Sequence, residues 1–197
     1  LGWSHGDDEV FSREQFVEWF DLNHITPSAA QFNTQKLNWL NAHYIKLADN
    51  DRLAADVRRR LALRQAQDTG TPSIESIVAL YKDRVQTLVE LTDAVEQLQG
   101  HPSPTAELKA QHLTEATRPI LAAFRTALND ITWDVPSIAA ALKATLADAG
   151  AKMPALAMPV RLALVGQTQT PSVDALIALF PREEVLRRID TLLACGN

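Results

Sequence analysis

Apolar residues recur at spacings of three and four positions along most of this chain, the periodicity of one face of an α-helix. The longest such stripe predicts two helices, bent between Thr87 and Thr92, and consists of Ile74, Ile77, Val78, Tyr81, Val85, Leu88, Leu91, Val95 and Leu98. A shorter stripe at Leu37, Leu40, Tyr44 and Leu47 predicts another helix, with Asn33 as its N-cap. No segment alternates apolar and polar residues with period two, so the pattern predicts an all-α fold.

The first helix is marked by its capping residues. Ser12 and Gln15 form a capping-box pattern, in which each side chain bonds the other residue's backbone amide. Phe11 and Phe16 can pack together across the helix start as a hydrophobic staple. This short helix should end near Phe20.

Proline, glycine and acidic residues mark the later helix boundaries. Thr26–Pro27 is a helix-start signal, and Asp49–Asp51 should cap an arginine-rich helix that stops near Gly70–Ser73. Gly100–Pro104 is the clearest linker in the chain. Further helices are predicted near 105–113, 115–130, 136–149, 157–165, 172–180 and 182–194, the third of these followed by Gly150 as its C′ residue.

The composition supports a helical interpretation. Of the 197 residues, 46% are hydrophobic and only 7 are glycine. No apolar run approaches the ~20 residues needed to span a bilayer, so we expect no membrane partner. The single cysteine, Cys195, excludes an intrachain disulfide and fits a reducing cytoplasm.

We interpret Trp3, Trp19, Trp39 and Trp133 as packing residues rather than as platforms for RNA bases.

The net charge of −5 argues against a nucleic-acid binder when the chain is taken as a whole. Locally, however, Arg58–Arg60 and Arg64 lie within two helical turns, and Arg182, Arg187 and Arg188 gather near the end. Consecutive residues of a helix point about 100° apart, so we interpret Arg58–Arg60 as a solvated face rather than as phosphate ligands. Charge therefore permits RNA binding without predicting it.

Ser4–Glu9, with the sequence SHGDDE, is the only cluster that looks catalytic or metal-binding. Its three carboxylates beside His5 could hold a hard cation. We favour the alternative of a tight turn with Gly6 at positive φ, because the spacing fits no calcium-loop pattern. The sequence also has no Gly-rich phosphate loop and no paired-cysteine zinc motif, so we predict no catalytic residue, metal site or cofactor in this chain.

The first 46 residues carry a more specific pattern. The segment GWSHGDDE is followed by a phenylalanine, by an acidic and aromatic helix, and then by FNTQKLNWLNAHYIK. This order resembles the segment that follows the catalytic core in bacterial glutamyl-tRNA synthetases. The ATP-holding HIGH-like and KMSKS-like motifs of that family are absent here. The resemblance implies that ATP, Mg²⁺ and glutamate activation belong to another part of a parent enzyme, of which this chain is the C-terminal part.

A second resemblance lies in MPVRLALVGQTQTPSVDAL. It is similar to the family motif PLR-x-ALTG followed by (S/T)P-x-(L/V), with Val165 in place of the usual threonine and an unusual Gln167–Gln169. The resemblance implies that the anticodon is contacted by Arg161, Thr170, Pro171, Ser172 and Val173. An arginine suits this task because its planar fork donates to base edges while it stacks. From the residues alone, Arg161 follows Pro159 at a predicted helix start and precedes a polar loop.

Arg84 lies in LYKDRVQTL, on a predicted helix. It falls where discriminating members of the family carry an arginine that reads the third anticodon base, which is C in glutamate tRNAs and G in glutamine tRNAs. The residues alone leave another interpretation open, in which Arg84 and Arg161 are solvated helix residues paired with nearby acids.

The resemblance implies three parts: 1–48, the end of a stem-contact domain, and 49–100 and 101–197, two helical anticodon-binding domains. The implied function is recognition of the tRNA(Glu) anticodon within a monomeric, cytoplasmic glutamate–tRNA ligase, with no DNA partner. The rival interpretation is a helical protein-interaction module without RNA binding, which acidic charge and alanine-rich helices suit equally well.

Overall fold

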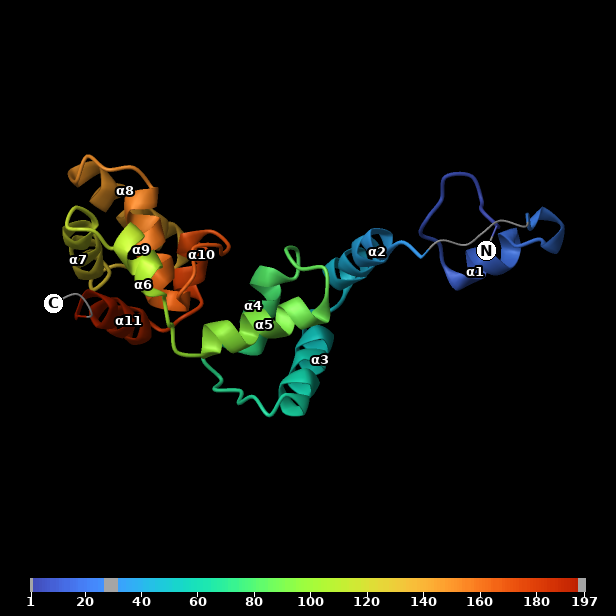
Figure 1. The fold of residues 1–197 in the computed structure, drawn as a ribbon, viewed down its shortest axis with the longest axis horizontal. Helices are drawn as coiled ribbons and strands as arrows, with labels where there is room; N and C mark the ends of the chain where they lie inside the picture. Colours follow the sequence, from blue (N-terminus) through green and yellow to red (C-terminus); the bar gives the residue numbers. More distant parts are fainter. Residues whose placement is uncertain (1, 27–31, 195–197) are drawn as a thin grey trace. The chain divides into compact units, whose positions relative to one another are not determined.

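The computed structural model describes residues 2–26 and 32–194 of the chain. Over these ranges the chain forms helices and no β-strand, which confirms the predicted all-α fold (Figure 1). In chain order the helices are α1 (Arg13–Trp19), η1 (Leu22–His24, a 3-10 helix), α2 (Thr34–Leu47), α3 (Asn50–Leu63), α4 (Ile74–Tyr81), α5 (Leu88–Gln99), α6 (Ala106–His112), α7 (Thr117–Ala127), α8 (Val135–Asp148), α9 (Pro154–Val165), α10 (Val173–Ala178) and α11 (Arg182–Ala194). Pro27, in the predicted helix start at Thr26–Pro27, and Cys195 lie outside the described residues.

The chain divides into two compact units, residues 1–38 and 39–197, and each is described by itself. The predicted boundaries at residues 48 and 100 stay predictions. Within the second unit, α3, α4 and α5 pack on one another, and α6 to α11 form another group of helices.

The first unit is held together by aromatic rings. Trp3 meets Phe11 and Phe16 edge-on, with ring centroids 5.9 and 5.4 Å apart, and His5 stacks on Trp19 at 4.1 Å. Such pairs stabilise a small unit beyond the area that they bury. Trp3 and Trp19 are therefore packing residues, as predicted.

Helix α1 starts with the predicted capping box. The Gln15 amide donates to the Ser12 hydroxyl at 3.1 Å, and the Ser12 amide donates to the Gln15 side chain at 2.8 Å. The rings of Phe11 and Phe16 stack with centroids 6.1 Å apart, which confirms the staple.

Helix α2 begins after Asn33, whose side chain accepts from the Lys36 amide at 3.0 Å, as predicted. The prediction that Trp39 packs is wrong, because its side chain is 49% exposed. Tyr44 of the predicted apolar stripe is likewise 51% exposed. Ile45, which lies off that stripe, is the residue of α2 that joins the core.

Helix α3 is capped by Asp49, which accepts from two backbone amides, but it ends at Leu63 rather than near Gly70. The apolar face stops at Leu61, and Gln65 turns the chain with a φ of +57°. Leu63, the last residue of the helix, is 85% exposed, and Ala66 packs against the core only after the turn, so a longer helix would bury no further apolar side chain.

The break between α4 and α5 comes earlier than the predicted Thr87–Thr92. Thr87 caps α5, because its hydroxyl accepts from the Glu90 amide at 3.2 Å while the Glu90 carboxylate accepts from the Gln86 amide at 2.7 Å. These two bonds form a reciprocal cap, which starts a new helix instead of bending one.

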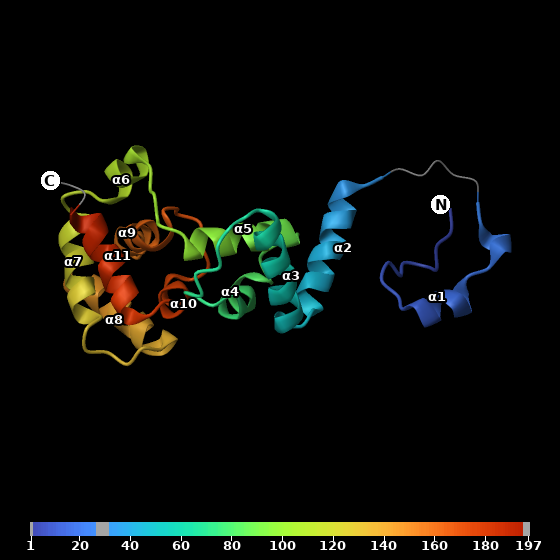
Figure 2. The same cartoon turned by 90° about the horizontal axis from the view of Figure 1, so that it is seen from below.

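The second group of helices surrounds α9, against which α6, α7, α10 and α11 all pack (Figure 2). Helix α9 is buried along most of its length, as its alanine- and leucine-rich sequence allows. It starts at Pro154, so Pro159 lies inside the helix and not at its start, contrary to the prediction.

Gly150 follows α8 with a φ of +58°, which confirms its role as C′ residue. Trp133 also packs as predicted, since its indole N–H donates to the Phe180 oxygen at 2.8 Å.

Candidate nucleic-acid interface

Arg161 projects from α9 onto the loop that follows this helix. Its Nε donates to the Thr170 hydroxyl at 2.8 Å, and its Nη2 donates to the backbone oxygen of Pro171 at 3.3 Å. Its Nη1 lies 3.8 Å from the sulfur of Met158. The half-buried guanidinium therefore bonds the loop, and the interpretation of Arg161 as a solvated residue paired with an acid does not describe its contacts.

The loop residues predicted to meet an RNA differ in how much they expose. Thr170 is half-buried and donates to the Pro171 oxygen at 2.9 Å, so both partners of Arg161 are tied to each other. Pro171 and Val173 are buried, Val173 to 6% exposure, while Ser172 is exposed at the start of α10. The structure thus brings Arg161, Thr170 and Pro171 together, with Ser172 as the accessible side chain beside them.

A groove of 390 Å³ lies beside this loop, between α8, α9 and α10. Its floor is apolar and its polar groups include Arg161 and Ser172, and it is lined by Ala139, Leu142, Lys143, Met153, Pro154, Ala157, Met158, Arg161, Ser172, Val173 and Asp174.

The lining residues that were not predicted from the sequence include Lys143, Met153 and Met158. Lys143 is exposed, and it is the only basic residue in the otherwise small and apolar α8. That contrast is a signal that could have identified it. The two methionines carry no comparable signal, because a methionine in an apolar helix is usually a core residue.

Arg84 lies in the turn between α4 and α5, and not on a helix as predicted. Its backbone amide donates to the Tyr81 oxygen at 2.8 Å, and its side chain is exposed. Burial raises the pKa of the Tyr81 hydroxyl to about 12, against a smaller lowering by the positive charge of Arg84. Arg84 and Arg161 belong to different groups of helices, and Arg84 is not among the residues that line the groove beside Arg161.

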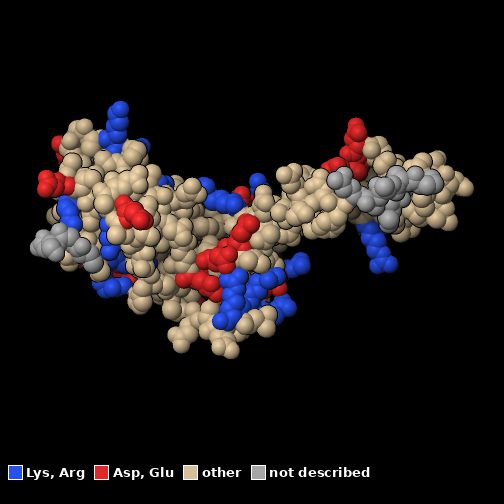
Figure 3. Space-filling model, in the orientation of Figure 1, with Lys and Arg blue, Asp and Glu red and all other residues tan. Residues whose placement is uncertain are grey.

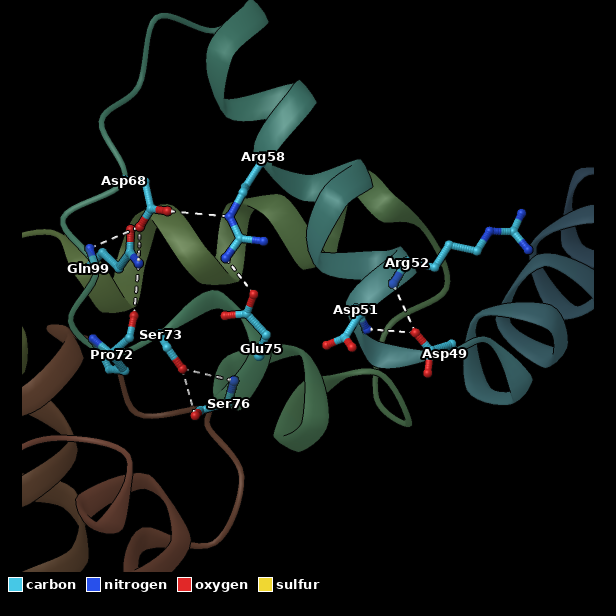
Figure 4. A network of polar contacts seen from close by, with 11 residues as sticks. Asp49, Asp51, Arg52, Arg58, Asp68, Pro72, Ser73, Glu75, Ser76 and Gln99 are labelled. Atoms are coloured by element: carbon cyan, nitrogen blue, oxygen red, sulfur yellow. Dashed lines mark hydrogen bonds and ion pairs between the residues drawn. The ribbon is translucent and has the colours of Figure 1, made fainter.

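Arg58 contacts acids of its own chain. Its Nη2 donates to Glu75 at 2.5 Å, and its Nε lies 3.7 Å from Asp68 (Figure 4). The hydrogen bond from Arg58 holds the pKa of the Glu75 carboxyl below its usual value. In the same network the buried Gln99 side chain donates to Asp68 at 2.9 Å and to the Pro72 oxygen at 2.8 Å. Arg58 therefore fastens the loop after α3, and Arg59 pairs with Asp56 of its own helix.

The arginines near the end of the chain are also bound internally. Arg182 donates to the backbone oxygens of Asn129 and Ile131. Arg187 bonds Glu184 at 2.7 and 2.8 Å, and Arg188 is buried to 5% exposure. On the face seen in Figure 3, basic and acidic side chains likewise lie next to one another around α3 and α5. The clustered arginines are thus largely structural, which leaves Arg84 and the Arg161 loop as the stronger candidates for RNA contacts.

The Ser4–Glu9 segment forms the predicted turn, with Gly6 at a φ of +56° and the Asp8 amide donating to the His5 oxygen at 3.2 Å. Within residues 2–26 and 32–194, no group of three or more His, Cys, Asp or Glu side chains is arranged to hold a metal ion. In the same part of the chain, no helix combines the length and apolarity that crossing a membrane requires.

Comparison with known proteins gives matches along nearly the whole chain. A family model described as an anticodon binding domain matches residues 52–193. The chain is 57% identical over 189 residues to a glutamate–tRNA ligase of Aromatoleum aromaticum, covering 96% of this chain and 41% of the relative. It is 56% identical over 189 residues to that of Azoarcus sp., covering 96% and 40%. The chain thus spans about two fifths of the length of these curated relatives.

Two solved structures share the fold. A glutamate tRNA ligase from Elizabethkingia meningosepticum, in complex with its amino acid, superposes with a TM-score of 0.88 at 23% identity, covering 100% of this chain and 39% of that one. A glutamate-tRNA synthetase from Elizabethkingia anophelis gives 0.84 at 23% identity, covering 98% and 38%. At this identity the likeness shows the fold alone.

Proposed function

This chain belongs to the anticodon binding domain family, and from that membership we propose that it recognises the anticodon of a glutamate tRNA as part of a glutamate–tRNA ligase. The family match spans both predicted anticodon-binding parts, and it does not favour the rival interpretation as a protein-interaction module. The relatives named glutamate–tRNA ligase support the choice of tRNA.

The observation that carries the proposal is the contact of Arg161 with Thr170 and Pro171. Single-stranded RNA loops are read by splaying bases onto side chains and bonding their Watson–Crick edges. Such readout needs a loop of fixed shape, because each hydrogen bond is directional. The Arg161 guanidinium holds this loop through its hydrogen bonds to Thr170 and Pro171, while the Ser172 side chain stays exposed for a base or sugar.

The groove beside the loop suits an unstacked base. Its apolar floor, with Met153 and Met158, can cover the face of a base, and the ammonium group of Lys143 can approach a phosphate. We assign Arg161, Thr170, Pro171, Ser172 and the backbone of Val173 to this subsite. Arg84 serves a second one, where it reads the third anticodon base.

The activity of the whole protein is a further proposal. We infer that the parent enzyme, a cytoplasmic monomer with no DNA partner, ligates glutamate to tRNA(Glu) with ATP and Mg²⁺. This chain lacks HIGH-like and KMSKS-like motifs, so we assign no step with ATP to its residues. Its part is to supply binding energy at the anticodon, which positions the distant acceptor end.

Binding of an anticodon stem-loop of tRNA(Glu), followed by fluorescence anisotropy, tests the proposal. We expect binding that weakens steeply between low and high salt, because phosphate contacts release counterions. Replacing Arg161 with Gln should weaken binding more than replacing Arg125, a surface arginine of α7 that pairs with Asp190. Equal effects of both variants, or no binding at low salt, would contradict the proposed function. ATP–pyrophosphate exchange by this chain alone would contradict the assignment of catalysis to the rest of the parent enzyme.

A further inference from the structure

The residues proposed to read the anticodon lie on two groups of helices. Arg84 belongs to α3–α5, whereas Arg161 and its loop belong to α6–α11. Among the helix pairs of the described chain, α5 against α9 is the principal contact between these groups (Figures 1 and 2). One RNA gains affinity from both surfaces only if their separation allows it to engage both at once.

Arg188 of α11 holds this region together. Its Nη1 donates to the Leu164 oxygen at the end of α9 at 2.5 Å. Its Nη2 donates to the Gly100 oxygen at 3.0 Å and lies 3.5 Å from the Leu98 oxygen at the end of α5. Its Nε donates to Glu184 at 2.6 Å, which neutralises the buried charge. A single side chain thus connects α5, the linker after it, α9 and α11.

Two further contacts fix the same end of α9. The Gln97 side chain donates from α5 to the Val165 oxygen at 3.0 Å. Gly166, with a φ of +73°, lies so close to the linker that a Cβ there would be 3.0 Å from the Ser103 nitrogen. We call this set the joint, and it consists of Gln97, Leu98, Gly100, Leu164, Val165, Gly166 and Arg188.

The joint lies directly beside the candidate RNA surface. Gly166, which caps the end of α9, immediately precedes the polar loop 167–172, and Arg161 lies less than one turn before Leu164. The same few residues therefore set both the start of that loop and the attachment of the helix group that carries Arg84.

We propose that Arg188 and Gln97 are positioning residues for anticodon recognition, which hold the Arg84 surface and the Arg161 loop in the register that one anticodon loop requires. This inference rests on the proposed function. Apolar contacts alone can slide, whereas the guanidinium fork fixes donors to several backbone oxygens in one plane. Arg188 and Gln97 touch no RNA; they act through Leu164, Gly100 and Val165.

A distance measurement tests the joint itself. Spin labels on cysteines at Ala55 of α3 and Ala140 of α8, both exposed, report the separation of the two groups in a chain whose Cys195 is replaced by Ser. We expect a narrow distance distribution in the wild-type background and broader ones in Arg188→Lys and Gln97→Leu. Arg187→Lys is the matched control, because Arg187 shares Glu184 with Arg188 but is exposed.

RNA discrimination separates positioning from a merely structural role. Loss of folded protein lowers binding of every RNA equally, so it leaves the ratio of affinities for stem-loops with C or G at the third anticodon base unchanged. Loss of register lowers that ratio, by about fivefold if one base contact is lost. We expect the ratio to fall in Arg188→Lys and in Gln97→Leu, and to stay at its wild-type value in Arg187→Lys.

The outcomes distinguish this inference from the proposed function. A wild-type chain that binds no stem-loop overturns both. A wild-type chain that discriminates, together with an unchanged ratio in Gln97→Leu and Arg188→Lys, overturns the positioning role alone. Unchanged distance distributions in both variants overturn it as well. If Arg188→Lys does not fold, Gln97→Leu decides by itself, because it removes one part-buried hydrogen bond and no buried charge.

Discussion

Glu184 accepts a hydrogen bond at 2.6 Å from Nε of Arg188, which lies one turn after Glu184 in α11. The guanidinium that holds α5 and α9 together is therefore itself oriented by a carboxylate of its own helix. Hydrogen bonds from Arg187 and Arg188 lower the pKa of Glu184 to about 2, against the opposing effect of burial.

This lowered pKa predicts a loss of stability in acid. The carboxyl titrates near 4.5 when unfolded and at about 2 when folded, so its contribution is complete above pH 4.5 and is lost as the pH falls toward 2. We expect Glu184→Gln to lower the free energy of unfolding at pH 7, by up to about 3 kcal/mol. Urea unfolding at pH 7 and pH 3 should show the two proteins converging in acid.

The neighbouring Glu183 supplies the control for this measurement. It is exposed and lies in the same first turn of α11. If Glu183→Gln costs as much stability at pH 7 as Glu184→Gln, the effect comes from the charge of the helix start and not from the arginine pair.

The Arg161 contacts predict that a lysine cannot replace this arginine. A lysine ammonium has no planar fork, so it does not keep separate N–H donors fixed on the Thr170 hydroxyl and the Pro171 oxygen, and the loop is held less rigidly. We expect Arg161→Lys to weaken binding of the tRNA(Glu) stem-loop by about tenfold, corresponding to ~1.4 kcal/mol. Thr170→Val removes the hydroxyl but keeps the hydrogen bond from Arg161 to the Pro171 oxygen, so its effect should be smaller. A Thr170→Val loss as large as that of Arg161→Lys would mean that the hydroxyl itself contacts RNA.

Replacing Arg84 should change the specificity of RNA binding and not its affinity alone. Its side chain is exposed in the turn before α5, so replacing it should leave the fold intact. We expect Arg84→Gln to reduce the preference for C over G at the third anticodon base by about fivefold or more, the loss of one base contact. Competition between two stem-loops measures this ratio directly. Arg59→Gln, which removes an exposed arginine paired with Asp56, should leave it unchanged.

Local features of this fold could be predicted from the sequence, and long-range ones could not. The capping box at Ser12 and the C′ role of Gly150 depend on residues within one turn, and both are confirmed. The end of α3 was missed because no proline or glycine stands between Leu63 and Gly70. After the turn at Gln65, the loop that follows α3 is held by Gln99, a residue far along the chain whose side chain donates to Asp68 and to the Pro72 oxygen.

The candidate interface shows the same limit. The motif around Arg161 marked the location, but its contacts with Thr170 and Pro171 depend on how the loop folds back. Nothing in REEVLRRID distinguishes Arg188 from Arg187, since both are arginines one residue apart. Only the approach of Leu98 and Gly100, about ninety positions earlier, buries one and leaves the other in solvent. The positioning role of Arg188 was therefore invisible in the sequence.

Gly166 and Gly150 provide a matched pair that tests whether the linker is held against α9. Both follow a helix with positive φ, +73° and +58°, so alanine at either position should cost ~1–2 kcal/mol of backbone strain. At Gly150 an added Cβ meets nothing within 4 Å, whereas at Gly166 it lies 3.0 Å from the Ser103 nitrogen and 3.2 Å from that of Pro104.

We therefore expect Gly166→Ala to lower the free energy of unfolding by at least ~1 kcal/mol more than Gly150→Ala, because backbone atoms of the linker must move. Urea unfolding of the two variants under one condition isolates this difference, since the strain of the left-handed residue is common to both. Gly166→Ala should also broaden the distance distribution between α3 and α8, while Gly150→Ala should not. Equal costs and equal distributions would show that the linker yields freely, and that the joint depends on its hydrogen bonds alone.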